Sequence, residues 1–186
     1  HQRARQPAFP PSDQRRRLRG GCRGGAAPSP QRRRKWWAEL YDSNFVKTLD
    51  TPRSADVKKA VDFIAAILGL EKGARILDLA CGMGGHAVEL AARGYQVTAV
   101  DLSPTMMKLA AMHAKDRDQQ VNFVQGDMRK LELDGVFDAI YCWSSSFGFF
   151  KHAQNEDVIQ RIARALRPEG RLALDITNPV SYTHLT

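Results

Sequence analysis

Two carboxylates that flank a glycine-rich turn are the residues best placed to do chemistry. Asp78 precedes the turn, Gly82 and Gly84 form it, and Asp101 follows Gly82 by 19 residues. Glycine lets a backbone approach a ligand with no side chain in the way. A carboxylate about 20 residues beyond such a turn can accept hydrogen bonds from ribose hydroxyls. The spacing therefore predicts a nucleoside site.

The carboxylate before the turn decides which nucleoside is favoured. Gly82, Gly84 and Ala87 also satisfy the dinucleotide fingerprint G-x-G-x-x-G/A, which alone would indicate a nicotinamide or flavin. A pyrophosphate binds such a turn through backbone N–H groups at a helix N-terminus, and the negative charge of Asp78 opposes this binding. S-adenosylmethionine has no phosphate and carries an ammonium and a sulfonium. Asp78 therefore favours S-adenosylmethionine.

Further segments of the chain also indicate an S-adenosylmethionine site. The sequence DLACGMG at 78–84 resembles the D/E-x-G/A-x-G-x-G motif of the class I S-adenosylmethionine-dependent methyltransferases. The resemblance covers roughly residues 36–179 and continues in order through AVDLSP (99–104), FVQGDM (123–128), FDAIYCWSSSFGFF (137–150) and ALRPEGRLALDITNP (165–179). One such motif is weak evidence, but five in register are specific. The resemblance implies a Rossmann-like, doubly wound parallel α/β sheet with S-adenosyl-L-methionine as cofactor.

The resemblance also implies individual cofactor contacts. Asp101 would hold the ribose hydroxyls, and Asp127 would accept a hydrogen bond from the adenine amine. Leu102 and Met128 would pack against the adenine ring. The full expected set is Asp78, Ala80, Gly82, Gly84, Asp101, Leu102, Asp127, Met128, Trp143, Tyr41 and Arg53. Structural alternatives stay open, such as an acid buried for structure alone at Asp78, a helix cap at Asp101 and a surface turn at Asp127.

Two of these contacts come from a likeness to small-molecule N-methyltransferases. Tyr41, in the segment WWAELYD, would close over the cofactor. Arg53 would pair with the methionine carboxylate. Helix packing and surface solvation are the respective alternatives. Residues 36–54 are therefore expected to form a lid segment before the core.

The segment CWSSSFGFF after the fourth expected strand should present the methyl acceptor. It lacks the N/D-P-P-Y/F signature for a flipped base and the Pro-Cys nucleophile for pyrimidine chemistry, which disfavours nucleic-acid modification. Trp143, Phe147, Phe149 and Phe150 should line an apolar pocket for a small-molecule acceptor, although two of the four are expected to be core residues only. Ser144 to Ser146 could hydrogen-bond the acceptor. The expected substrate contacts are Ser144, Phe147 and Phe149.

Methyl transfer from a sulfonium needs little covalent help from the protein. It is an in-line displacement with an excellent leaving group, and positioning supplies much of the acceleration. Catalytic residues therefore stay unassigned, with Tyr41 and His152 as weak candidates, because only an acceptor with a proton to lose needs a base. The expected function is methyl transfer to a nitrogen or oxygen of a small molecule. A nicotinamide-dependent oxidoreductase and a non-catalytic S-adenosylmethionine-binding protein stay open as alternatives.

The net positive charge of the chain comes from residues 1–35. This stretch holds 11 of the 28 Lys and Arg residues and, in Asp13, one of the 20 Asp and Glu residues. It has too few apolar residues to offset ordering entropy, so a disordered basic tail is expected. Such a tail could bind nucleic acid or an anionic membrane, or could be non-native sequence. Without an apolar run of ~20 residues or a signal segment, we expect no membrane partner and a cytoplasmic location.

The elements that must position these residues alternate along the chain. Strands are expected at 75–80, 96–102, 121–124, 137–143 and 171–177, and helices at 55–68, 84–93, 104–115 and 155–166. Ser54, Ser103 and Asn155 are the expected N-caps. The alternation implies a parallel sheet with helices on both faces and a site at the carboxyl ends of its strands. The core at 55–180 is expected to be truncated after its fifth strand, because the family normally has seven, and 181–186 to be non-native.

Overall fold

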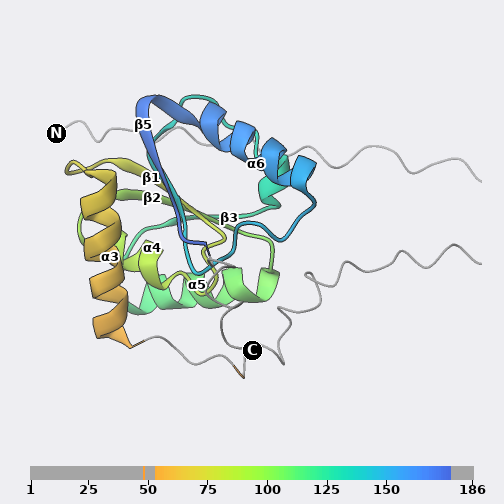
Figure 1. Cartoon of the computed structure of the whole chain (residues 1–186). Coiled ribbons are helices and arrows are strands. Elements are labelled where there is room, and N and C mark those ends of the chain that lie inside the picture. Colours follow the sequence, from red (N-terminus) through yellow and green to blue (C-terminus); the bar gives the residue numbers. More distant parts are fainter. Residues whose placement is uncertain (1–47, 49–52, 177–186) are drawn as a thin grey trace, which may run out of the picture. The chain divides into compact units, whose positions relative to one another are not determined.

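The computed structural model describes residue 48 and residues 53–176. In this part of the chain, five strands form one parallel sheet in the order β3-β2-β1-β4-β5. The strands are β1 (Arg75–Leu79), β2 (Gln96–Asp101), β3 (Asn122–Gln125), β4 (Phe137–Cys142) and β5 (Leu166–Leu174). The chain starts in the middle of the sheet and winds outward first to one edge and then to the other (Figure 1). This is the doubly wound α/β arrangement expected from the alternation of elements.

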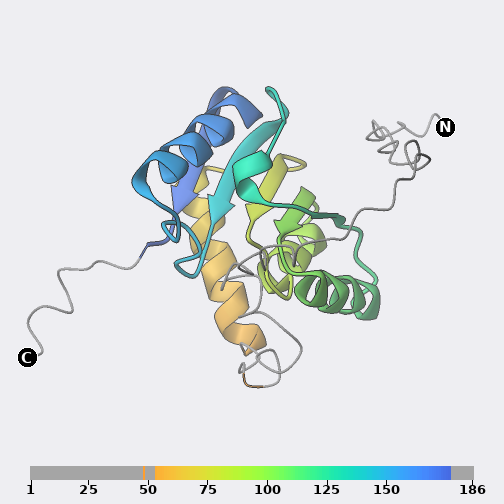
Figure 2. The ribbon, with the colours of Figure 1, turned by 90° about the vertical axis from the view of Figure 1, so that its right-hand side faces the viewer.

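Helices cover both faces of the sheet (Figures 1 and 2). The helices are α3 (Ser54–Leu68), α4 (Gly85–Ala92), α5 (Pro104–Asp116), the 3-10 helix η1 (Met128–Lys130) and α6 (His152–Ala165). Helices α3, α4 and α5 pack on the face that carries Ile76, and α6 packs on the face that carries Leu77. Because β1 is central, successive side chains are buried on opposite faces, which explains its apolar run. None of the helices described is both long and apolar enough to cross a membrane.

Several expectations concern residues outside the described ranges. These are the basic tail at 1–35, most of the lid segment at 36–54 including Tyr41, and the end of the chain at 181–186. The boundaries of β1 to β4 and of α3 to α5 lie within one residue of those expected. Ser103 caps α5 as expected, because its Oγ accepts a hydrogen bond from the Met106 N–H at 3.3 Å.

Two of the expected N-caps are wrong. Helix α3 begins at Ser54 itself, because the extended Arg53 before it takes the N-cap position without a side-chain hydrogen bond. Helix α6 begins at His152, three residues before Asn155. The Asn155 side-chain amide instead donates to the carbonyl of Phe150 at 2.9 Å. Asn155 therefore holds the loop before the helix from inside the first turn.

Strand β5 also differs from the expected range of 171–177. It begins at Leu166, which pairs with Phe137, and then shifts register so that Ala139 pairs with Arg171. Glu169 has φ +66°, and a Cβ at Gly170 would lie 2.8 Å from a backbone carbonyl oxygen. The bulge therefore needs glycine at position 170. It lets β5 begin five residues before the expected start at 171.

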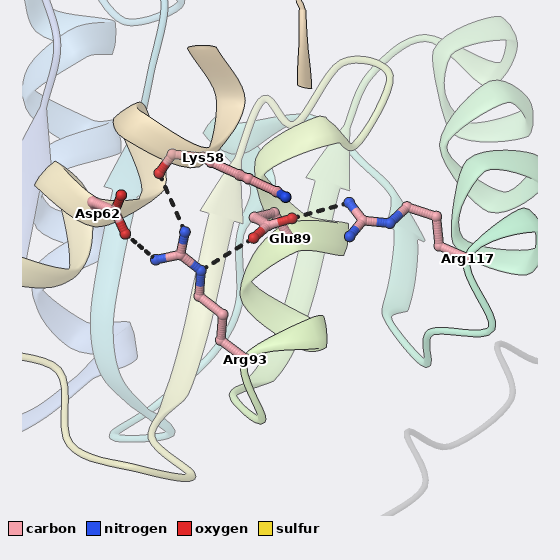
Figure 3. A network of polar contacts seen from close by, with 5 residues as sticks. All are labelled: Lys58, Asp62, Glu89, Arg93 and Arg117. Atoms are coloured by element: carbon pink, nitrogen blue, oxygen red, sulfur yellow. Dashed lines mark hydrogen bonds and ion pairs between the residues drawn. The ribbon is translucent and has the colours of Figure 1, made fainter. Parts of the chain in front are cut away.

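A charged cluster joins the three helices on one face (Figure 3). Glu89 of α4 accepts hydrogen bonds from Arg93 Nε at 3.2 Å and from Arg117 Nη1 at 3.0 Å. Arg93 also bonds Asp62 Oδ1 at 2.6 Å and the Lys58 carbonyl at 3.2 Å, both on α3. The Glu89 side chain is 8% exposed, so the two guanidinium groups satisfy a carboxylate that water cannot reach freely.

Replacing Glu89 by glutamine should destabilise the fold. Burial alone would raise the pKa of Glu89, but hydrogen bonds and charges from Arg117 and Arg93 outweigh it and lower the pKa. A carboxyl group whose pKa is lower in the folded state stabilises that state at pH values above the ordinary carboxyl pKa. The stabilisation is lost as the pH falls through the folded-state pKa. We expect Glu89→Gln to lose about 1–3 kcal/mol of unfolding free energy at pH 7, with the gap closing in acid, measured by urea unfolding.

Asp62 supplies the matched control, because it pairs with the same Arg93 but its side chain is 68% exposed. Asp62→Asn should change the unfolding free energy by less than about 1 kcal/mol. An equal loss in both variants would show that burial of Glu89 contributes nothing to the network.

Candidate active site

A cavity of about 240 Å³ opens at the carboxyl ends of the central strands. It lies between the end of β1, the end of β2 with the start of α5, and the loops that follow β3 and β4. Its lining residues are Leu79, Ala80, Gly82, Val100, Asp101, Leu102, Ser103, Pro104, Met106, Gly126, Asp127, Met128, Ser146, Phe149 and Phe150. The walls are mainly apolar, with the carboxylates Asp101 and Asp127 among them. A doubly wound sheet places ligands at this edge.

The structure gathers many of the expected site residues in this cavity. Those that line it are Ala80, Gly82, Asp101, Leu102, Asp127, Met128 and Phe149. Those described that do not line it are Asp78, Gly84, Trp143, Ser144, Phe147, Arg53 and His152. Tyr41 is outside the described residues.

Asp101 is fixed to the glycine turn by its carboxylate. Its Oδ2 accepts the Gly82 N–H at 2.8 Å, and its Oδ1 accepts the Ser103 N–H at 2.8 Å. Burial raises the pKa of Asp101, and the hydrogen bonds from Ser103, Gly82 and Leu102 offset only part of this effect. A carboxylate can accept about four hydrogen bonds, so these contacts position its oxygens without saturating them. Ser103 is the cap of α5, so the alternative role of Asp101 as that cap is not supported.

The two glycines of the turn serve different purposes. Both have positive φ, +54° at Gly82 and +72° at Gly84. A Cβ on Gly82 would meet nothing within 4 Å, whereas one on Gly84 would lie 2.8 Å from the Cβ of Ala110 on α5. Gly82 thus keeps a cavity wall open, and Gly84 allows α5 to approach the turn. Ala80 has φ +63°, a conformation that costs a non-glycine residue energy and is concentrated at functional sites.

Asp78 lies beneath the turn and outside the cavity lining. It is 2% exposed and pairs in register with Tyr141 of β4. Burial raises the pKa of Asp78 to about 7, the Tyr141 hydroxyl lowers it, and the charge of Asp101 raises it. No hydrogen bond of ordinary geometry satisfies Asp78 Oδ2 or the Tyr141 hydroxyl among the described residues, so Tyr141 acts on Asp78 through its proximity. Asp78 can therefore act on a ligand in the cavity through its charge rather than through contact.

Two of the four aromatic residues after β4 line the cavity. Phe149, which is 46% exposed, and Phe150 form part of its wall. Phe147 packs against the core under α6. Trp143 lies in a separate groove between α3 and β5, with its ring centroid 6.0 Å from that of Phe63. Phe147 and Trp143 are therefore the two that do not line the cavity, whereas Phe150 both lines it and packs against the core.

An acid after β5 holds the serine loop. Ser144 N donates to Asp175 Oδ2 at 2.9 Å, and Ser145 N donates to the Asp175 carbonyl at 3.1 Å. Both serines have positive φ, +58° and +55°. Ser144 therefore contributes backbone contacts to the loop, while Ser146 reaches the cavity. Sequence reasoning missed Asp175, and its only signal was an acid directly after the last apolar strand.

Arg53 and His152 are not brought to the cavity. Arg53 is exposed, and its carbonyl accepts the first hydrogen bonds of α3. The His152 side chain is 91% exposed and lies 3.2 Å from Glu156 one turn later on α6. Neither position supports the role expected from sequence. Sequence reasoning also missed Val100, Ser103, Pro104 and Met106 as cavity residues, although all four flank Asp101 at the end of β2.

Comparison with known proteins gives the family. A model of the family described as "Methyltransferase domain" matches residues 76–170, just over half of the chain. The glycine/sarcosine N-methyltransferase of Parasynechococcus marenigrum is 33% identical over 162 residues, which are 84% of this chain and 57% of that protein. The ubiquinone biosynthesis O-methyltransferase of Xanthomonas oryzae pv. oryzae is 36% identical over 121 residues, 63% of this chain and 48% of that protein. The chain thus spans about half the length of these curated relatives.

Solved structures share the architecture. The PH0226 protein from Pyrococcus horikoshii matches with a TM-score of 0.63 and 25% identity, covering 79% of this chain and 68% of that chain. An amino pentose methyltransferase from Micromonospora echinaspora, solved with S-adenosylmethionine bound, matches with a TM-score of 0.55 and 28% identity, covering 69% and 52%. With the motif order, the doubly wound sheet and the family match in agreement, the chain belongs to the class I S-adenosylmethionine-dependent methyltransferases.

Proposed function

We propose that this chain binds S-adenosyl-L-methionine in the cavity and transfers its methyl group to a nitrogen or oxygen of a small molecule. The observation that carries the proposal is the convergence of Asp101 and Asp127 on one mainly apolar cavity beside Gly82. Cofactor sites are typically apolar clefts with a few convergent polar groups. The two carboxylates suit a ligand that presents hydroxyl and amine donors.

In this proposal each wall of the cavity has a part in holding the cofactor. Asp101 accepts hydrogen bonds from the ribose hydroxyls, and Asp127 accepts one from the adenine amine. Leu102 and Met128 line the same cavity and would pack on the two faces or edges of the base. The bound cofactor supplies an electrophilic methyl group on a sulfonium. Asp78, once ionised, would favour a cationic ligand nearby.

The acceptor would enter on the side of the loop after β4. Ser146, Phe149 and Phe150 give this side a hydroxyl and two aromatic rings, which suits a small molecule with an apolar part. The acceptor lone pair forms a bond to the methyl carbon as the carbon–sulfur bond breaks, and the sulfur keeps that electron pair. A proton on the acceptor then leaves to solvent or to a base. Two of the relatives are named for N-methylation of glycine or sarcosine and for O-methylation in ubiquinone biosynthesis.

Two measurements test this function on the full chain. Calorimetric titration with S-adenosylmethionine should show saturable binding, and titration with NAD should show none. Incubation with methyl-labelled cofactor and a panel of amines, N-methyl amino acids and phenols should then label at least one acceptor. Binding of NAD in place of S-adenosylmethionine would contradict the proposal.

The second candidate function is S-adenosylmethionine binding without methyl transfer, either in a non-catalytic protein or in an enzyme that catalyses another reaction. A solved structure described as a [4+2]-cyclase matches with a TM-score of 0.55 and 28% identity, covering 62% of this chain and 43% of that chain. The fold alone therefore does not assign methyl transfer. Binding of S-adenosylmethionine without labelling of any acceptor in the panel would favour this candidate.

A further inference from the structure

Arg129 holds Asp127 through both its backbone and its side chain. Arg129 donates to Asp127 Oδ1 from its backbone N–H at 3.0 Å and from Nε at 2.9 Å. Its Nη2 donates to Asp127 Oδ2, which makes the side-chain pair bidentate. The two side chains are only 13% and 14% exposed. Bidentate guanidinium–carboxylate pairs are strong and fix the plane of the carboxylate.

The same guanidinium also contacts Phe150, a second residue of the cavity lining. Arg129 Cζ lies 4.4 Å from the centroid of the Phe150 ring, the geometry of a cation–π contact. The Phe150 backbone is held in turn by the side-chain amide of Asn155. Asp127 and Phe150 line the cavity, whereas Arg129 is not among its lining residues. Arg129 therefore links two residues of the cavity lining without lining the cavity itself.

This arrangement determines whether a nucleobase must present a hydrogen-bond donor or an acceptor to the Asp127 carboxylate. The hydrogen bonds with Asp127 raise the pKa of Arg129, so the guanidinium stays charged at any working pH. A carboxylate pinned by a guanidinium can only accept hydrogen bonds. It accepts from the exocyclic amine of adenine, but it meets the carbonyl oxygen of hypoxanthine as another acceptor. A buried site built for a donor discriminates strongly against an analogue that lacks it.

We propose that Arg129 is the positioning residue for base specificity: it holds Asp127 as an acceptor for the adenine amine and links this contact to Phe150. The proposal rests on the proposed function, because it takes the cavity to be the nucleoside site. Lysine cannot replace arginine fully at such a position, since its ammonium is a point charge without the planar fork.

The test compares two product-like ligands that differ only at the base. S-adenosylhomocysteine and S-inosylhomocysteine are titrated calorimetrically into the full chain carrying the wild-type sequence, Arg129→Gln, Arg129→Lys or Arg161→Gln. Arg161 is the matched control, because it bonds the Leu131 carbonyl at 3.1 Å and so also joins α6 to the segment after η1. Its other partner is Asp157 rather than a cavity residue.

We expect the wild type to prefer the adenosyl ligand by roughly 10- to 100-fold, the scale of a hydrogen bond to a charged group. Arg129→Gln should reduce this preference to less than about 3-fold, Arg129→Lys should retain part of it, and Arg161→Gln should retain all of it. A general loss of stability would weaken both ligands equally and leave their ratio unchanged. If Arg129→Gln does not fold, Arg129→Lys decides.

Each other outcome has a definite meaning. A wild-type preference preserved in folded Arg129→Gln overturns the role of Arg129. A wild type that binds both ligands equally shows that Asp127 does not read the base, which overturns the inference but leaves the cofactor site. A wild type that binds neither ligand overturns the proposed function itself.

Discussion

Replacing Asp101 by alanine should weaken binding of S-adenosylmethionine by roughly 1.5–3 kcal/mol, the scale of a hydrogen bond to a charged group. This loss corresponds to a 10- to 100-fold rise in Kd. The physical reason is that Asp101 is one of two carboxylates in the cavity and would accept both ribose hydroxyls. The variant also frees the N–H groups of Gly82 and Ser103, both bonded to this carboxylate at 2.8 Å. Calorimetry on the folded variant gives the measurement.

Two further variants separate the ligand contact from the support of the turn. Asp101→Asn keeps one acceptor oxygen and should fall between wild type and alanine. Asp138→Asn is the control, because Asp138 is also an acid of the sheet, bonded to the Arg75 N–H at 2.6 Å at the opposite end of the strands. It should leave the Kd unchanged. Wild-type affinity in folded Asp101→Ala would remove Asp101 from the cofactor site.

The sheet and the residues at its strand ends could be predicted because the signals for them are local. Apolar runs and glycine turns define strands and helices, and parallel pairing then brings the carboxyl ends to one edge. Asp101 is the last residue of β2 and Asp127 follows the end of β3 by two residues, so their arrival in one cavity needed no knowledge of side-chain packing. The same holds for Leu102 and Met128, their immediate neighbours.

The acceptor side could not be predicted in the same way, because long-range contacts set its geometry. Ser144 and Ser145 turn with positive φ while bonded to Asp175, which is about thirty residues away along the chain. This turn sends Trp143 towards α3 and leaves Phe149 and Phe150 at the cavity. An apolar loop sequence does not say which rings pack inside. The composition supported only the expectation that some of them would.

The buried acids show a second limit of sequence reasoning. Glu89 is buried because Arg93 and Arg117 satisfy it, and Arg117 lies beyond the end of α5. Asp78 is buried against Tyr141 on the neighbouring strand, a register that only the structure gives. The sequence marked Asp78 as unusual in an apolar strand, but it did not indicate whether the acid would contact a ligand or lie beneath it.

Asp78 should make the stability of this protein fall as pH rises. Burial raises the pKa of Asp78 from 3.8 to about 7. Between these two values the folded state keeps a proton that the unfolded state has lost, so the unfolding free energy decreases with rising pH. Each pKa unit corresponds to about 1.4 kcal/mol, so the cost should reach on the order of 4 kcal/mol above pH 7. Urea unfolding at several pH values between 4 and 8 measures it.

Asp78→Asn imitates the protonated carboxyl and should therefore remove most of this pH dependence. The variant should match wild type near pH 4 and exceed its unfolding free energy by at most about 4 kcal/mol at pH 8. The gain is smaller by the free energy that the buried amide loses where it lacks a hydrogen-bond partner. Asp134→Asn, which changes an exposed acid, is the control and should follow the wild-type pH profile. A variant less stable than wild type at pH 8 would show that the ionised carboxylate is satisfied in the fold.

The cost of an ionised Asp78 makes sense if a ligand uses the charge. The charge of Asp101 already contributes to the raised pKa of Asp78, so a second negative charge at Asp78 is unfavourable without a cation nearby. A ligand with a sulfonium and an ammonium would stabilise the ionised form, so binding should release a proton below about pH 7 and tighten as pH rises. Calorimetry in buffers of different ionisation enthalpy would detect that proton. Asp78→Asn should then be more stable than wild type at pH 8, and it should bind S-adenosylmethionine more weakly and without proton release. A variant that is more stable but binds S-adenosylmethionine as tightly as wild type would leave Asp78 without a role in the site.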